Sequence, residues 1–296
     1  MGLRFSKMHG AGNDFVILDL RGGKPSPPDA LVRAIGDRHR GVGFDQLLSI
    51  DDSRREDCVA AYRIWNTDGS RAEQCGNGAR CVAAWVMRAG MAAAPRFSLD
   101  SPAGPIVVDC LDDGQFALDM GAPIFAPAAI PLSAGSEGGG SEGGGSEAGG
   151  SEADGSEAEV YSVIIDGRAL RFGAASMGNP HAVIEVDSVD DADVEGIGRA
   201  LQQSSLFPAS VNVGFAQVID PGHIKLRVYE RGAGETLACG SGACAAVAVL
   251  ARQGLVGTHV AVDLPGGRLT IDWPGGDAAI RMAGPATFVF EGEWQE

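Results

Sequence analysis

The sequence lacks several features that would place the protein in other classes. It has no run of 18 apolar residues, which a membrane-spanning helix requires. Residues 1–10 contain no apolar core of the kind that a secretory signal needs. Only 23 basic residues stand against 39 acidic ones, and the net charge of −16 argues against nucleic acid, whose phosphates require a basic surface. We therefore expect a cytoplasmic protein with neither nucleic acid nor a membrane as partner.

Cysteine is sparse as well. Six cysteines in 296 residues are too few for a disulfide scaffold, and no two of them form a C-x-x-C pair of the kind found in structural zinc sites. We predict reduced thiols and no metal site. Four of the cysteines stand in apolar contexts and are expected to be inert core residues: Cys58, Cys81, Cys110 and Cys244.

The remaining composition is that of a globular protein with one unusual tract. Hydrophobic residues make up 45% and charged residues 21% of the chain, and 296 residues allow two domains. Residues 134–159 contain only ten Gly, five Ser, four Ala and seven acidic residues. Such a tract has no large apolar side chain to bury, so we expect a disordered acidic insertion at the surface.

Two copies of a short motif divide the chain. Cys-Gly-Asn-Gly-Ala at residues 75–79 resembles Cys-Gly-Ser-Gly-Ala at residues 239–243, and with these cysteines aligned residues 62–66 fall on residues 226–230. Two weaker matches follow in the same order, Gly43-Phe44-x-Gln46 with Gly214-Phe215-x-Gln217 and Gly12-Asn13 with Gly178-Asn179. Repetition in one order indicates two similar halves, with the acidic tract near the start of the second.

Each half is expected to contain many strands and one buried helix. Alternating apolar and polar residues predict strands over residues 62–65, 96–100, 106–110, 115–119, 161–165, 183–186, 213–219, 225–229 and 268–273. The segments 79–87 and 243–252 are apolar on nearly every face, so each should be a helix buried on all sides. We predict an α+β fold of two pseudo-symmetric domains, each a mainly antiparallel sheet wrapped around a central helix.

The two matching cysteines then lie at the starts of two buried helices. Free amides and the macrodipole at a helix N-terminus stabilise a thiolate, and the glycines that follow let a ligand carboxylate approach the same amides. If the halves face each other, Cys75 and Cys239 flank one small anion from opposite sides. One thiolate can remove a proton from carbon while the other thiol protonates the opposite face, which inverts a stereocentre without a cofactor.

Polar residues recur around the two cysteines. Glu230 and Arg231 follow a predicted strand and supply an anion beside a bidentate cation, which would suit a zwitterionic amino acid, although a surface ion pair is an equal alternative. His181 is either a loop histidine or a group that tunes a thiol. The other candidates, each of which taken singly would be a turn or cap residue, are Asn13, Gln46, Asn66, Asn179 and Asn212.

These residues resemble the motifs of the diaminopimelate epimerase family. The resemblance covers nearly the whole chain except the acidic tract. Its motifs are Lys-Met-His-Gly-Ala-Gly-Asn-Asp-Phe at 7–15, Gly-Val-Gly-Phe-Asp-Gln at 41–46, Asn-Thr-Asp-Gly-Ser at 66–70, the cysteine motif at 75–81, Met-Gly-Asn-Pro-His at 177–181, Asn-Val-Gly-Phe at 212–215, and residues 229–242.

The resemblance implies an isomerase that interconverts LL- and meso-2,6-diaminopimelate in lysine and peptidoglycan precursor synthesis, with no cofactor, pyridoxal phosphate included. It implies that Cys75 donates and Cys239 accepts the proton in the LL-to-meso direction. His181 and Glu230 would tune the thiols. The residues implied to bind substrate are Asn13, Gln46, Asn66, Gly76, Asn77, Asn179, Asn212, Glu230, Arg231, Gly240 and Ser241.

The resemblance also implies how the chain is divided. Residues 1–121 and a returning strand at residues 287–291, within 286–296, would form one half, and residues 122–285 the other. The partner would be the small-molecule substrate, and a homodimer stays open.

Two other classes are considered. A proline or hydroxyproline racemase would share the two-cysteine architecture, but its ligand lacks a second amino-acid end that would need Glu230 and Arg231. A non-catalytic thiol redox switch or small-anion binding module needs only one reactive cysteine, so the matched pair disfavours it.

Deleting residues 135–157 should leave turnover and melting temperature nearly unchanged, because a solvated polar tract holds few packed contacts. Epimerisation assays and thermal melts of the deletion variant against the full chain measure this. A large loss of activity in a normally folded variant would mean that the tract has a function.

Overall fold

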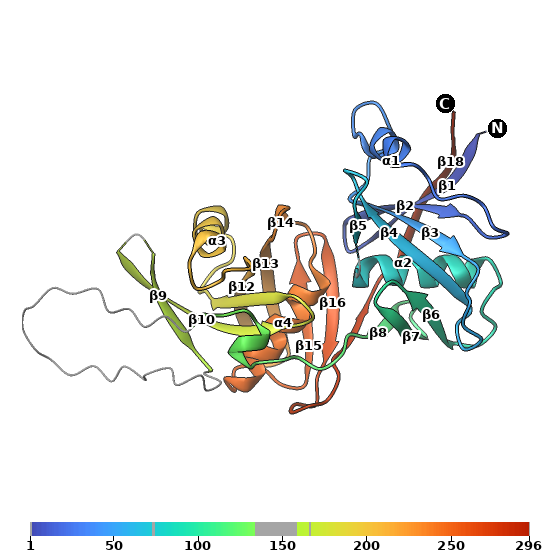
Figure 1. Ribbon diagram of the computed structural model, residues 1–296. Helices are drawn as coiled ribbons and strands as arrows, with labels where there is room; N and C mark the ends of the chain where they lie inside the picture. Colours follow the sequence, from blue (N-terminus) through green and yellow to red (C-terminus); the bar gives the residue numbers. More distant parts are fainter. Residues whose placement is uncertain (1, 73–74, 134–158, 166, 296) are drawn as a thin grey trace, which may run out of the picture.

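The computed structural model describes residues 2–72, 75–133, 159–165 and 167–295 (Figure 1). The predicted insertion at 134–159 lies, but for its last residue, outside the described residues. The two halves lie beside each other, each with a helix at its centre, and both ends of the chain lie at the top of the first half (Figure 1).

Two lists give the elements in chain order. The first half contains β1 (Leu3–Gly10), β2 (Asn13–Asp19), α1 (Asp29–Gly36), β3 (Gln46–Asp51), β4 (Ala60–Asn66), β5 (Arg71–Ala72), α2 (Gly76–Arg88), β6 (Arg96–Ser101), β7 (Gly104–Cys110) and β8 (Phe116–Asp119). A 3-10 turn (Pro127–Ala129) follows, and then β9 (Tyr161–Ile165), β10 (Arg168–Ser176), β11 (Pro180–Glu185), α3 (Val194–Gln203), β12 (Asn212–Asp220), β13 (His223–Glu230), β14 (Gly234–Thr236), α4 (Gly240–Arg252), β15 (His259–Leu264), β16 (Gly267–Asp272), β17 (Arg281–Gly284) and β18 (Thr287–Trp294).

The halves repeat each other strand by strand. β2 runs parallel to β3, as β11 runs parallel to β12, and β4 runs parallel to β6, as β13 runs parallel to β15. The remaining pairs within each half, from β1–β2 to β7–β8 and from β10–β11 to β16–β17, are antiparallel. The outer neighbour of β1 is β18, and that of β10 is β9. The predicted α+β fold of two similar halves is confirmed.

The two central helices are the best-buried elements of the halves. In α4 ten of the thirteen residues are buried, since its sequence offers only Ala, Val, Leu and Cys to the surrounding strands. Gly173 on β10 makes this packing possible, because a Cβ there would lie 2.3 Å from Cγ1 of Val249. Phe15, Ile17 and Leu48 pack in the same hydrophobic cluster as the buried face of α2. Burial on all sides, as predicted, therefore fixes both helices in place.

Two strand pairs connect the halves. β18 crosses from the second half and pairs along the whole of β1, from Leu3 opposite Trp294 to His9 opposite Thr287. β17 pairs with β8, so the last strand of each repeat joins its counterpart. These pairings support the proposed division into residues 1–121 with 286–296 and residues 122–285.

The sequence missed several elements for identifiable reasons. α3 contains Gly196 and Gly198, which weaken helix propensity, and a Cβ at Gly198 would lie 2.6 Å from Tyr229. β1 has four consecutive buried residues from Phe5, so it lacks the alternation of a half-exposed strand. α1 has only eight residues.

One repeat alignment is wrong. Phe15 pairs with Gln46 and His181 pairs with Asn212 in the matching parallel ladders. Gln46 is therefore the counterpart of Asn212, and not of Gln217 as the Gly-Phe-x-Gln match suggests. Asn66 and Glu230, which end the next strand of each half, correspond as predicted.

Candidate active site between the halves

A cavity of about 1270 Å³ lies between the two halves, and both contribute to its wall. The predicted site residues that line it are Asn13, Gln46, Asn66, Cys75, Gly76, Asn77, Asn179, Glu230, Arg231, Cys239, Gly240 and Ser241. Asn212 and His181 are not in the wall and are buried behind it, 3% and 1% exposed. Folding thus brings together twelve of the fourteen residues that the sequence singled out.

The starts of α2 and α4 meet at this cavity. Cys75 is the N-cap of α2 and Cys239 the N-cap of α4, both in extended conformation. Met282 of β17 lies against both helix starts: a Cβ on Gly76 would be 2.6 Å from its Cε, and one on Gly240 would be 3.0 Å from its Sδ. Glycine at these two positions lets the helix starts approach the same side chain.

Burial dominates the ionisation of the two thiols. It raises the pKa of Cys75 to about 11, against the opposing effect of the Gly78 and Asn77 amides, and Sγ accepts a hydrogen bond from Gly78 N at 3.4 Å. Burial likewise raises the pKa of Cys239 well above its ordinary value. The expectation that the helix start favours a thiolate thus identifies only the weaker of two effects: in the free protein desolvation is stronger, and both thiols are protonated at neutral pH.

Glu230 acts on both thiols. After burial, its negative charge is the main cause that raises the pKa of Cys239, and it also raises that of Cys75. Thr236 Oγ1 donates a hydrogen bond to its Oε1 and holds the carboxylate in the cavity wall. One carboxylate therefore bears on both cysteines, although 164 positions separate them in the repeat from its counterpart in the first half.

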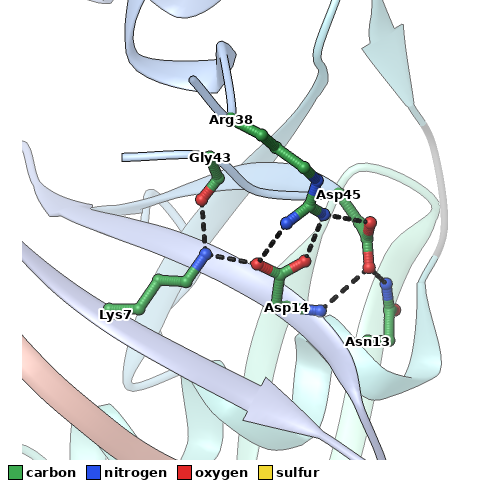
Figure 2. Close-up of polar contacts among 6 residues, drawn as sticks. All are labelled: Lys7, Asn13, Asp14, Arg38, Gly43 and Asp45. Atoms are coloured by element: carbon green, nitrogen blue, oxygen red, sulfur yellow. Dashed lines mark hydrogen bonds and ion pairs between the residues drawn. The ribbon is translucent and has the colours of Figure 1, made fainter. Parts of the chain in front are cut away.

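Asn13 is held by a network of charged side chains that Figure 2 shows. Its Nδ2 donates to Asp45 Oδ2 at 2.7 Å, and Arg38 Nη2 donates to Asp45 Oδ1 at 2.7 Å and to Asp14 Oδ1 at 2.7 Å. Lys7 pairs with Asp14 on the other side (Figure 2). Because the Asn13 amide nitrogen is bound to a carboxylate, its oxygen is the atom that faces inward.

The inward oxygen of Asn13 meets the first cysteine. Cys75 Sγ lies 3.7 Å from Asn13 Oδ1, as donor, and Asn77 Nδ2 lies 3.4 Å from the same oxygen. An acceptor at this position stabilises the protonated form of the thiol. Asp14, Arg38 and Asp45 were missed as site residues, although two of them stand inside the motifs at 7–15 and 41–46.

The second cysteine has a different neighbourhood. Ser241 Oγ lies 3.7 Å from Cys239 Sγ and 3.1 Å from Nε2 of His181, which also contacts Asn179 Oδ1 at 3.0 Å. Burial lowers the pKa of His181 to about 3, helped by the charge of Arg231, so the ring is neutral. His181 therefore reaches Cys239 only through Ser241.

The asparagines divide into two groups by what they contact. Gln46 Nε2 donates to Asn66 Oδ1 at 3.1 Å, and Gln46 Oε1 is buried without a hydrogen-bond partner among the described residues. Asn212 instead donates to Pro180 O at 3.0 Å and accepts from Arg231 N at 2.9 Å. In this structure Asn212 positions the backbone of Arg231, whereas Gln46 leaves an acceptor toward the cavity.

The other cysteines lie away from the cavity. Cys81 and Cys244 are fully buried, and burial raises the pKa of Cys244 to about 12 and that of Cys81 further. Cys58 is 8% exposed. Cys110 was expected in the core, but it is only partly buried at the end of β7. Within the described ranges no three potential metal ligands cluster, and no helix is long and apolar enough to cross a membrane.

Solved structures place this architecture among cofactor-free isomerases and their relatives in fold. A phenazine biosynthesis protein of the PhzF family from Bacillus anthracis matches with a TM-score of 0.67 at 16% identity, covering 100% of both chains. A hydroxyproline epimerase from Agrobacterium vitis matches with a TM-score of 0.65 at 17% identity, over 99% of this chain and 92% of that one. At these identities the likeness shows the fold alone.

The sequence defines the family. The model of the diaminopimelate epimerase family matches residues 5–126 and 173–289. Curated diaminopimelate epimerases are 55% identical over 294 residues in Xanthomonas campestris, covering 99% of this chain and 97% of that protein, and 54% identical over 292 residues in Xylella fastidiosa, covering 99% and 96%. The chain belongs to the diaminopimelate epimerase family, and it is an isomerase.

Replacing Glu230 by glutamine should make both cavity thiols more reactive. The neutral amide removes the negative charge that raises both pKa values, so at pH 8 a larger fraction of each thiol is ionised. Iodoacetamide alkylation of Cys75 and Cys239, followed by peptide mass spectrometry, should accelerate about three- to tenfold.

Glu235→Gln is the matched control, since Glu235 lines the same cavity but is held by Arg227 at 2.7 and 2.9 Å. It should leave both alkylation rates unchanged. Equal rates in Glu230→Gln and the unaltered protein would refute the electrostatic role of Glu230.

Proposed function

We propose that this protein interconverts LL- and meso-2,6-diaminopimelate by transferring protons between carbon and two opposed thiols, without a cofactor. The observation that carries this proposal is the matched pair of N-cap cysteines, Cys75 and Cys239, at two buried helix starts in the wall of one cavity. Membership of the diaminopimelate epimerase family supplies the substrate. The reaction belongs to lysine and peptidoglycan precursor synthesis, and we place it in the cytoplasm.

The proton inventory balances with two cysteines alone. In the LL-to-meso direction the Cys239 thiolate removes the α-proton, and the Cys75 thiol delivers its own proton to the opposite face of the carbon. The cycle leaves Cys239 as thiol and Cys75 as thiolate, which the reverse reaction or exchange with solvent resets. The contact of Cys75 with Asn13 Oδ1 supports its role as the protonated partner.

Substrate binding offers a way to ionise a thiol that is protonated at rest. Glu230 raises the pKa of both thiols while its charge is uncompensated. An ammonium group of the substrate beside Glu230 would neutralise that charge and favour the thiolate. Thiolate formation would thus be coupled to the presence of substrate, which limits alkylation and oxidation of the free protein.

The two ends of the substrate would use different groups. The amides of Gly76, Asn77, Gly240 and Ser241 at the helix starts suit the carboxylate on the reacting carbon, where negative charge develops. Arg231 and Glu230 suit the distant carboxylate and ammonium. Gln46, with its unpartnered Oε1, and Asn66 offer further hydrogen bonds, with Asn13 and Asn179 beside the cysteines and Asn212 and His181 as supports from behind.

A proline or hydroxyproline racemase is the nearer alternative. The solved structure of a hydroxyproline epimerase has the same fold, so the fold does not separate the two activities. Glu230 and Arg231 in the cavity wall favour a ligand with a second amino-acid end. A homodimer is part of the proposal, and the exposed Val289 and Phe290 of β18 are an apolar surface that a second copy could cover.

Incubation with LL-diaminopimelate in D₂O tests the proposal by proton NMR. A thiol exchanges its proton with solvent, so inversion should replace one α-proton by deuterium as the meso isomer forms. Cys75→Ala and Cys239→Ala should each fold normally and lose epimerisation by about 10²- to 10⁴-fold. Undiminished α-proton signal with fresh, folded protein would refute the epimerase activity.

Cys81→Ala and Cys244→Ala are the matched controls, since each is the same substitution on the same two helices but away from the cavity. Both should keep turnover within a few-fold of the unaltered protein. Near-normal epimerisation in Cys75→Ala or Cys239→Ala would remove that cysteine from the mechanism.

A further inference from the structure

Arg80 is a buried cation that the mechanism above does not use. Its side chain is 0% exposed and lies one turn into α2. Nη2 donates to Asn77 Oδ1 at 2.6 Å, Nε donates to Pro285 O at 3.3 Å, and Nη1 lies 3.8 Å from Met282 Sδ. Among the residues that the structure describes, no carboxylate forms an ion pair with it. A buried charge with only neutral partners is costly, so its retention calls for a physical reason.

The fold leaves room for this guanidinium at two glycines. A Cβ on Gly10, at the end of β1, would lie 3.3 Å from Arg80 Nη2. A Cβ on Gly284, at the end of β17, would lie 3.2 Å from both Cζ and Nε. The group is therefore enclosed by elements from both halves, directly behind the helix starts.

Through Asn77 the guanidinium reaches both cysteine segments. Because Asn77 Oδ1 accepts from Arg80, the Asn77 amide nitrogen must face the other way. There it donates to Asn13 Oδ1 at 3.4 Å, beside Cys75, and to Ala238 O at 3.3 Å, in the residue before Cys239. Fixing one amide thus ties the start of α2 to the segment that precedes α4.

The charge of Arg80 also bears on Cys75. The charged group that faces Cys75 from β13 is Glu230, which raises its pKa, whereas Arg80 lowers it. Tyr62 of β4 and Cys81 of α2 are the other ionisable neighbours, and burial raises the pKa of both, so they are neutral. Arg80 is thus the one cation among these neighbours that opposes Glu230.

We propose that Arg80 is a positioning residue for proton transfer: it orients Asn77 across the two halves and places a permanent positive charge behind Cys75. This inference rests on the proposed function for its effect on turnover. Its effect on the Cys75 thiol does not depend on which substrate the protein takes.

Two substitutions separate the two effects. Arg80→Gln removes the charge, whereas Arg80→Lys keeps the charge and loses the planar fork that holds Asn77. For each we measure the pH midpoint of Cys75 alkylation by iodoacetamide, with peptide mass spectrometry, and then kcat and KM for LL-diaminopimelate. Arg88→Gln is the matched control, because Arg88 is on the surface of the same helix, paired with Glu291 at 2.9 Å.

Arg80→Gln should raise the Cys75 midpoint by about half a pH unit or more, and Arg80→Lys should keep it within about 0.3 units. Both should lower kcat about tenfold or more and change KM less than about threefold, because the oriented donors act most strongly as charge develops. Arg88→Gln should change neither quantity.

An unmoved midpoint in folded Arg80→Gln would overturn the electrostatic part, and wild-type kcat in Arg80→Lys would overturn the positioning part. If Arg80→Gln does not fold, Arg80→Lys decides: an unmoved midpoint with a lowered kcat supports the inference, and a raised midpoint or an unchanged kcat contradicts it. Absence of epimerisation in the unaltered protein would refute the proposed function, while the alkylation midpoints would still test the charge of Arg80.

Discussion

The contact of Met282 with the first glycines of α2 and α4 is the constraint on which the site depends. It holds two buried helices with their N-terminal ends toward one cavity, so the free amides of both point at the same ligand. Each helix can only lie there because its own half wraps it in strands, and because β17 joins β8 while β18 returns to β1. The cavity is thus a consequence of how two repeats close against each other.

Burial at this junction creates the chemical problem that the surrounding charges address. A buried thiol is a poor base because it keeps its proton, and the helix amides do not outweigh desolvation at either cysteine. Glu230 strengthens the protonated state from the cavity side, and Arg80 weakens it at Cys75 from behind. A cationic substrate group would shift this balance, which is why the same carboxylate can serve both binding and ionisation.

The repeat made the fold class, both central helices and both cysteines predictable from the sequence. It worked because a helix that is apolar all round has one solution, burial, and because a glycine turn repeated beside cysteine needs a shared cause. It failed where tertiary contacts override local pattern: α3 forms despite two glycines, and the pairing of Phe15 with Gln46 corrects the alignment of Gln46 with Gln217.

The parts of the site that escaped prediction are those set by distances between elements. Nothing in the motif at 75–81 distinguishes Arg80, fully enclosed, from Arg88 on the surface of the same helix. Asn212 and His181 were candidates for direct contact with substrate, but the structure puts both behind the wall. The network of Asp14, Arg38 and Asp45 lies in quoted motifs, yet only the folded chain brings its members to Asn13.

The central claim is that the two thiols face one carbon from opposite sides, and isotope exchange by single-cysteine variants tests it most directly. In D₂O, Cys75→Ala retains Cys239 and should exchange the α-proton of the LL isomer without converting it. Cys239→Ala retains Cys75 and should exchange the corresponding proton of the meso isomer alone. Exchange of both isomers by either variant, or the opposite pairing of variant and isomer, would contradict the account.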